Sequence, residues 1–175
     1  MFTDPKSNID QFGILPGQIV ADLGSGSGFY AVECARAVGD KGHVYAVDIQ
    51  QESLSRSRVL ANRESLYNID VIWGDLERLG GSHIPNGAVD AAVISNVLFQ
   101  IQDKKGFMSE LRRILKPHSR VLVIDWSDEF GAGGPPAQLL LPEASARTLF
   151  DGEGFIFEKE IHAGSSHYGF IYRTP

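Results

Sequence analysis

The sequence has 175 residues, of which 43% are hydrophobic and 22% are charged, and its formal net charge is −6. This composition is typical of a globular protein, so we expect one folded domain over residues 1–175. The acidic balance disfavours nucleic acid as a partner, because the surface would repel phosphates. No apolar run reaches the length of about 18 residues that a membrane-spanning helix needs, so we expect no membrane attachment.

The cysteine and histidine residues indicate where the protein is located and whether it binds a metal. Cys34 is the only cysteine, and no charged and then apolar signal segment opens the sequence, so we expect a cytoplasmic protein. The five histidines are scattered along the chain, and one thiol cannot build a thiolate zinc site. We therefore expect no metal.

Short apolar, β-rich runs alternate with helical segments from residue 18 onward. Alternation at intervals of about 20 to 30 residues is typical of parallel βαβ units with helices on both faces of one sheet. The fold class that this pattern predicts is α/β. The expected strands are residues 18–23, 43–48, 70–74, 89–95 and 120–126, and the expected helices are residues 29–38, 51–62 and 103–116.

The last part of the chain follows a different pattern. Residues 155–163 and 168–174 are two expected strands joined by a turn too short for a crossover, so this pair should be antiparallel. Before them, residues 127–142 combine glycines and prolines with three consecutive leucines, Leu139 to Leu141. We interpret this segment as a candidate lid, with the alternative that its leucines begin a helix covering the sheet.

Three glycines mark the first candidate site. Gly24, Gly26 and Gly28 follow the first expected strand and lead into a helix. Glycines let the backbone approach a ligand closely, and the amino terminus of the helix attracts an anion, either a pyrophosphate or an amino-acid carboxylate. A dinucleotide-binding motif would have a further glycine at the position that Phe29 occupies.

An acidic residue just ahead of these glycines favours one of the two ligands. The Asp22 carboxylate would repel a pyrophosphate, but it would attract the ammonium and sulfonium groups of S-adenosylmethionine. The alternative interpretation is a glycine-rich turn with a solvated Asp22.

Two more acids follow the next two expected strands. Asp48 can accept hydrogen bonds from both hydroxyls of a ribose, and Asp75, after Gly74, can accept one from an adenine amino group. Each of these acids taken alone is more often a turn residue. Three acids at successive carboxyl ends of parallel strands should meet at one edge of the sheet, where open α/β sheets bind ligands.

The ordered set of these motifs resembles the class I S-adenosylmethionine-dependent methyltransferases, in particular the subgroup related to ubiquinone and menaquinone biosynthesis C-methyltransferases. The resemblance runs from about residue 14 to residue 126. It rests on Ala-Asp-Leu-Gly-Ser-Gly-Ser-Gly at 21–28, Ala-Val-Asp-Ile at 46–49, Trp-Gly-Asp-Leu at 73–76, Val-Asp-Ala-Ala-Val-Ile-Ser-Asn at 89–96, and residues 111–117 and 120–125.

The resemblance implies a single Rossmann-like, doubly wound sheet of seven strands in the order 3-2-1-4-5-7-6, with strand 7 antiparallel. It also implies that Ser25 lines the methionine part of the cofactor with its neighbouring glycines, and that Ser95 and Asn96 lie beside the sulfonium. The adenosine would be held by Asp48 with Ile49 and by Asp75 with Leu76. The expected cofactor-binding residues are therefore Asp22, Gly24, Ser25, Gly26, Gly28, Asp48, Ile49, Gly74, Asp75, Leu76, Ser95 and Asn96.

We therefore expect an S-adenosylmethionine-dependent methyltransferase that acts on a small molecule. Transfer from a sulfonium depends mainly on alignment and needs a base only for some acceptors, so we assign no catalytic residue. His162 and His167, beside the last turn, are candidate bases, although packing roles are commoner for such residues. Asp125, Trp126 and Asp128 are candidates to line the acceptor pocket.

Two other functions stay open at this point. One is a cofactor-binding partner subunit without activity, since fewer than twenty residues precede the first strand, which is too few for the helical lid of many relatives. The other is a nicotinamide-dependent oxidoreductase, which Phe29 disfavours. The sequence also leaves open the methyl acceptor, the atom that is methylated and whether the chain forms a homo-oligomer.

Overall fold

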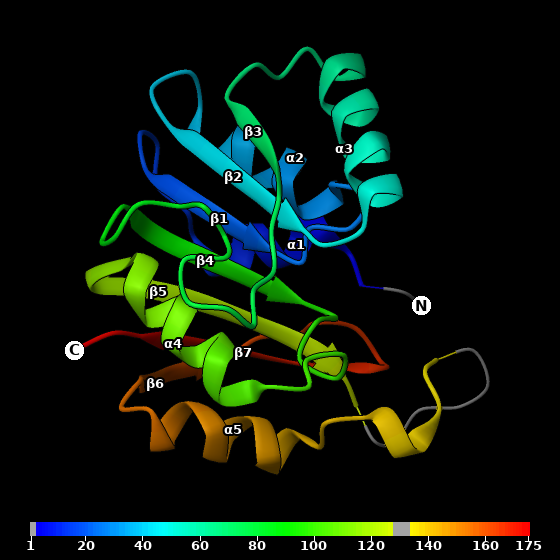
Figure 1. The fold of residues 1–175 in the computed structure, drawn as a ribbon, viewed down its shortest axis with the longest axis vertical. Helices are drawn as coiled ribbons and strands as arrows, with labels where there is room; N and C mark the ends of the chain where they lie inside the picture. Colours follow the sequence, from blue (N-terminus) through cyan, green and yellow to red (C-terminus); the bar gives the residue numbers. More distant parts are fainter. Residues whose placement is uncertain (1–2, 128–133) are drawn as a thin grey trace.

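The computed structural model describes residues 3–127 and 134–175, and in them seven strands form one sheet in the order β3-β2-β1-β4-β5-β7-β6 (Figure 1). Strands β1 to β5 are parallel to one another, and β7 runs antiparallel between β5 and β6. Both the predicted strand order and the antiparallel last strand are confirmed. The strands are β1 Ile19–Leu23, β2 His43–Asp48, β3 Ile69–Trp73, β4 Val89–Ser95, β5 Leu115–Trp126, β6 Ile156–Glu160 and β7 His167–Arg173.

Helices cover both faces of the sheet, as the alternating pattern predicted. Apolar side chains of α1 and α2 pack against one face, and those of α4 and α5 pack against the other. Helix α3 packs along β2 and β3 beside α2. The helices are α1 Pro5–Phe12, α2 Phe29–Val38, α3 Gln51–Arg63, α4 Lys104–Ile114 and α5 Glu143–Gly152, with a short 3-10 helix η1 at Ala137–Leu139.

The strand order reverses beside β1, and this reversal locates the ligand-binding edge. The chain moves outward from β1 through β2 to β3, and then returns to place β4 on the other side of β1. The connections that leave the carboxyl ends of β1 and β4 therefore run in opposite directions and leave a crevice between them.

The segment before β1 forms a short helix that the sequence did not predict, and this helix packs on the sheet. Asp4 caps α1 by accepting a hydrogen bond from the Ser7 N–H at 3.2 Å. Pro5 is the first residue of the helix, a position that proline favours. Ile9 and Phe12 are buried against the sheet. Arg120 of β5 donates to the Phe12 carbonyl at 2.6 Å, which anchors the end of the helix.

The segment 127–142 is only partly described, because residues 128–133 lie outside the described ranges. Leu139 is exposed in η1, whereas Leu141 packs against the core. The three leucines do not begin the helix that covers the sheet, because Leu139 ends the short η1 and α5 starts only at Glu143. The lid over the ligand site stays a prediction.

The sequence predicted no membrane-spanning helix and no metal site, and the described residues can be compared with both predictions. None of their helices combines the length and apolar character needed to cross a membrane. Within the same ranges, no three His, Cys, Asp or Glu side chains come together as they would around a metal ion.

Candidate functional site

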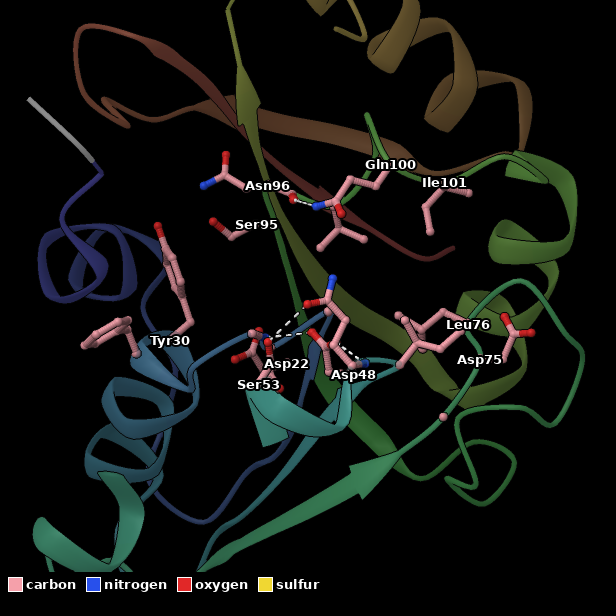
Figure 2. A pocket seen from close by; sticks show the side chains of 18 of the residues that line it. Asp22, Tyr30, Asp48, Ser53, Asp75, Leu76, Ser95, Asn96, Gln100 and Ile101 are labelled. Carbon is pink, nitrogen blue, oxygen red and sulfur yellow. Dashed lines mark hydrogen bonds between the residues drawn. The ribbon is translucent and has the colours of Figure 1, made fainter. Parts of the chain in front are cut away.

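A cavity of about 720 Å³ opens at the carboxyl ends of β1, β2, β3 and β4 (Figure 2). Every expected cofactor-binding residue except Gly28 lines it. The cavity also has walls that the sequence did not single out, among them Thr3, Tyr30, Ser53 and Gln100. Ser53 and Gln100 are near predicted strand ends in sequence, but no sequence signal connects Thr3 to this site.

The three glycines serve different purposes at the cavity. Gly24 and Gly26 have φ values of 76° and 53°, in the left-handed region that favours glycine. A Cβ atom at Gly24 would overlap Val97, and one at Gly28 would overlap Ser57 of α3. Gly28 therefore permits close packing between α2 and α3 and does not face the cavity.

Asp22 is a buried carboxylate on the cavity wall. It is 1% exposed, and its Oδ2 atom has no hydrogen-bond partner among the described residues. Burial raises its pKa to about 7, and the charge of Asp48 adds to this rise, whereas a hydrogen bond from the Ala31 backbone opposes it. A buried carboxylate without a partner is unfavourable when it is ionised, so a cation in the cavity would stabilise its charged form.

Three more buried polar atoms on the same wall lack partners in the described chain. They are Ser25 Oγ, Ser95 Oγ and Asn96 Oδ1. Buried polar atoms in folded proteins are nearly always hydrogen-bonded. Four such atoms around one cavity, with Asp22 Oδ2 included, indicate that a polar ligand completes this site.

Asp48 connects the end of β2 to the glycine turn. Its Oδ2 atom accepts a hydrogen bond from the Gly26 N–H at 2.8 Å, and its Oδ1 atom accepts one from the Gln50 N–H at 2.8 Å (Figure 2). A carboxylate has about four acceptor positions, so both oxygens retain a free position after these bonds. The predicted contact with ribose hydroxyls is therefore compatible with this geometry.

Asp75 has closer partners in its own turn than the sequence suggested. Its Oδ1 atom accepts from the Glu77 N–H at 3.0 Å, and its Oδ2 atom lies 3.0 Å from Arg78 Nε. Figure 2 shows its side chain at the far end of the cavity from Tyr30. The hydrogen bond to adenine stays a prediction.

Asp125 is not among the residues that line the cavity. Its Oδ1 atom accepts from the Trp126 N–H at 2.8 Å, and its Oδ2 atom accepts from the Phe99 N–H at 3.2 Å, so it holds the loop after β4. Burial raises its pKa to about 6, although these backbone bonds oppose the shift. Asp128, the third candidate for the acceptor pocket with Trp126, lies outside the described residues.

Neither candidate base lines the described cavity. The backbone N–H and carbonyl of His162 are held by the side chain of Gln11. His167 is buried against Trp126, with the ring centroids 4.2 Å apart, and burial lowers its pKa to about 4. His167 is therefore neutral at physiological pH and packs on Trp126, and its role as a base stays a prediction.

The sheet order, the glycine turn and the acid-lined cavity at the reversal of strand order define a class I S-adenosylmethionine-dependent methyltransferase fold. A family model described as a methyltransferase domain matches residues 14–148. The chain belongs to this family, and the family expected from the motifs is confirmed.

Individual relatives are consistent with this membership. The chain is 35% identical over 123 residues to the ubiquinone/menaquinone biosynthesis C-methyltransferase UbiE of Vibrio campbellii, which covers 70% of this chain and 46% of that protein. The chain thus spans about half the length of the curated relatives it matches.

Solved structures show how widely the fold is used. A SAM-dependent methyltransferase from Aquifex aeolicus is 26% identical, with a TM-score of 0.90 over 99% of this chain and 91% of that one. The [4+2]-cyclase SpnF is 15% identical, with a TM-score of 0.82 over 98% of this chain and 79% of that one. The second likeness concerns the fold alone, and it shows that this fold does not by itself determine the reaction.

Proposed function

We propose that this chain transfers a methyl group from S-adenosylmethionine to a small-molecule acceptor. The observation that carries the proposal is the buried Asp22 carboxylate, whose unpartnered Oδ2 faces the same cavity as the glycine turn. The cofactor's positive charge would satisfy this carboxylate, and its own carboxylate would suit the amino terminus of α2. Family membership and the likeness to UbiE support the same conclusion.

The remaining cavity residues suit the other parts of the cofactor. Asp48 would bind the ribose hydroxyls, and Ile49 with Leu76 would enclose the adenine, near Asp75 and Gly74. Ile49 is 55% exposed in the protein alone, and an adenine ring would cover part of this apolar surface. Ser95 and Asn96, at the end of β4, would lie beside the sulfonium.

The residues of the chain would act mainly by orientation. The cofactor supplies a methyl group on a positively charged sulfur, which departs as a neutral thioether. The cavity walls would hold this methyl in line with the acceptor atom and exclude water, and alignment of this kind accounts for a large share of enzymatic rate enhancement. The absence of a His or Lys among the described lining residues fits a transfer that needs no strong base.

The proposal includes a cytoplasmic location and a small-molecule acceptor. A cytoplasmic location is supported by Cys34, the only cysteine, which is a free and buried thiol. A small acceptor is supported by the names of the UbiE relatives, and the net charge of −6 continues to disfavour nucleic acid.

Calorimetric titration with S-adenosylhomocysteine and, separately, with NAD tests the cofactor assignment. We expect saturable binding of S-adenosylhomocysteine and none of NAD at the same concentration. Tight NAD binding would instead favour the oxidoreductase. Transfer of labelled methyl from S-adenosylmethionine to a panel of small acceptors then tests the reaction.

A cofactor-binding protein without transfer activity is the second candidate. It is favoured by the likeness of the fold to that of the [4+2]-cyclase SpnF. Binding of S-adenosylhomocysteine with no labelled product from any acceptor in the panel would support this candidate over the first.

A further inference from the structure

The two ends of the cavity differ in charge. Asp75 lies at one end (Figure 2), where the adenosine would lie, and the acids Asp48 and Glu77 also line the cavity. Tyr30 and Asn96 lie at the opposite end (Figure 2), and Thr3 joins them because Tyr30 Oη donates a hydrogen bond to Thr3 Oγ1 at 3.2 Å. We call Thr3, Tyr30 and Asn96 the acceptor end, and none of its side chains is charged.

No basic side chain is available at the acceptor end. None of the described residues lining the cavity is a Lys, Arg or His, and residues 1–2 and 128–133 contain none in the sequence. Arg56 and Arg78 are paired with Glu52 and Asp75. Lys104 donates to the carbonyl of the lining residue Ile101, which lies away from Tyr30 and Asn96 (Figure 2). An anionic acceptor would find no basic side chain among the described lining residues and would approach Asp22.

A cationic acceptor would also meet an unfavourable environment. Asp48 and Asp75 would lie beside the adenosine, and the Glu77 carboxylate accepts hydrogen bonds from the Gln102 and Asp103 N–H groups. Asp22 would already be paired with the cofactor's own positive charge. The transferred methyl is attached to a sulfonium, which would repel a second cation at close range. Charge therefore disfavours both ionic classes of acceptor at the same place.

Tyr30 is held rigidly at this end by a residue of α1. The buried Asn8 side chain donates from Nδ2 to Tyr30 Oη at 2.8 Å, which fixes the phenol. The longer bond from Tyr30 to Thr3 occupies the phenolic proton but can be exchanged for a bond to a ligand. Across the cavity, Asn96 Oδ1 and Ser95 Oγ are buried acceptors that lack a partner in the described chain.

We propose that the acceptor end takes an uncharged small molecule bearing a hydroxyl group, which donates to Asn96 Oδ1 while Tyr30 positions it. This inference rests on the proposed function. In the transfer, the acceptor atom supplies the electron pair for the new bond to the methyl carbon. The pair of the broken C–S bond stays on sulfur, and the displaced acceptor proton is released to bulk solvent after the transfer, when the product leaves the cavity.

Three phenols of similar size and different charge test the class of acceptor. They are 4-hydroxybenzyl alcohol, which is uncharged, 4-hydroxybenzoate, which is anionic, and tyramine, which is cationic. Dissociation constants are measured by ligand-observed NMR on protein saturated with sinefungin, an unreactive cofactor analogue with an amine at the sulfonium position. We expect the alcohol to bind at least about tenfold more tightly than either ion, a difference of about 1.4 kcal/mol. Equal or tighter binding of an ion, or binding of none of the three, overturns the proposal.

Two variants test the residues independently. Asn96→Gly removes Oδ1 while keeping the left-handed backbone, since Asn96 has a φ of 58° that glycine adopts without strain. Tyr30→Phe removes the hydroxyl but leaves the Asn8 amide without its buried partner, so its stability is measured alongside. The matched control is Tyr67→Phe, because Tyr67 is 87% exposed and does not line the cavity.

At saturating sinefungin, we expect each site variant to weaken binding of 4-hydroxybenzyl alcohol about fivefold to tenfold, and the control to leave it unchanged. Unchanged binding in Asn96→Gly and in folded Tyr30→Phe contradicts the assignment of these residues. Failure of the parent protein to bind S-adenosylhomocysteine or sinefungin would instead refute the proposed function, so the two failures can be told apart.

Discussion

Asp22 combines two opposing effects at the scale of a single residue. Its carboxylate is destabilising when ionised in the ligand-free protein, yet the ionised form is the one that a cationic cofactor would bind. A site that binds charge often keeps such an unfavourable group, because the ligand supplies the missing partner.

The raised pKa of Asp22 predicts the stability of Asp22→Asn. In the unfolded chain the group titrates at its ordinary pKa of 3.8, whereas in the folded protein it stays protonated up to about pH 7. Its favourable contribution is therefore complete below about pH 4 and is lost as the pH rises to 7. We expect Asp22→Asn to raise the free energy of unfolding at pH 8 by about 1 to 4 kcal/mol, measured by urea denaturation. An equal gain at pH 4 would contradict this origin.

The same carboxylate predicts how cofactor binding depends on pH. Because the ionised form would pair with the ammonium group of S-adenosylhomocysteine, affinity for this ligand should fall as the pH drops below about 7, by at most about tenfold per pH unit. Calorimetry between pH 5.5 and 8 measures this slope. Asp22→Asn should bind more weakly and show a flatter profile. An unchanged slope in the variant would assign the pH dependence to another group.

Replacing Asp48 should also weaken the binding of S-adenosylhomocysteine. Asp48→Ala removes the hydrogen bond to the Gly26 N–H and the expected bonds to ribose, so we expect S-adenosylhomocysteine binding to weaken by about 2 to 3 kcal/mol. Asp40→Ala, which changes an exposed acid away from the cavity, serves as the control. Equal dissociation constants for the parent and Asp48→Ala would remove this residue from the site.

At the scale of elements, Glu110 of α4 fixes the loop after β3, which forms one wall of the cavity. It accepts hydrogen bonds from the Gly80 N–H at 2.6 Å and the Ser82 N–H at 3.0 Å, and it pairs with Arg113 at 2.7 Å. Burial alone would raise its pKa, but the bonds from Arg113, Ser82 and Gly80 lower it to about 2. The loop is therefore held by an ionised carboxylate.

Glu110→Gln should destabilise the protein by about 1 to 3 kcal/mol at pH 7, because the amide cannot satisfy all of these donors. The depressed pKa means that the parent's advantage is present above the ordinary pKa of 4.5 and is lost as the pH falls towards 2. Urea denaturation at pH 7 and pH 3 measures the difference, with the exposed Glu143→Gln as control. A cost that does not shrink at pH 3 would contradict the role of the charge.

The sequence predicted best those elements whose own apolar pattern marks where they begin and end. Strands β2 and β4 have the predicted bounds because both are apolar runs buried within a parallel sheet. Helix α1 was missed because it buries only three residues, one of them the polar Asn8, which leaves a weak apolar pattern. Strand β6 is shorter than expected, since it is exposed at the sheet edge and ends at Glu160.

The same distinction explains what was foreseen of the site. The acids and glycines at strand ends were predicted to converge because parallel strands bring their carboxyl ends to one edge. Tyr30 and Thr3 could not be foreseen, because only the docking of α1 on α2 brings them together through Asn8. Sequence periodicity does not encode that contact, which depends on the three-dimensional path of the first residues.

For the whole molecule, the binding site and the stability of the fold should be coupled. The cavity joins the carboxyl ends of β1 to β4 with the loop after β3 and the segment before α1, so most of the sheet contributes to it. A ligand that binds only the folded state stabilises it by mass action, by about 2.7 kcal/mol at a concentration one hundred times its dissociation constant.

In a chain of 175 residues, that stabilisation should raise the midpoint of thermal unfolding by about 5 to 10 °C at saturating S-adenosylhomocysteine and pH 8. Differential scanning calorimetry measures the shift, with NAD at the same concentration as the matched control because it shares the adenosine but brings a pyrophosphate. The shift should be smaller at pH 5.5, where Asp22 is protonated, and smaller in Asp22→Asn at pH 8. An equal shift with NAD would mean that adenosine alone is recognised, and it would remove the physical basis for pairing Asp22 with the ammonium group of the ligand.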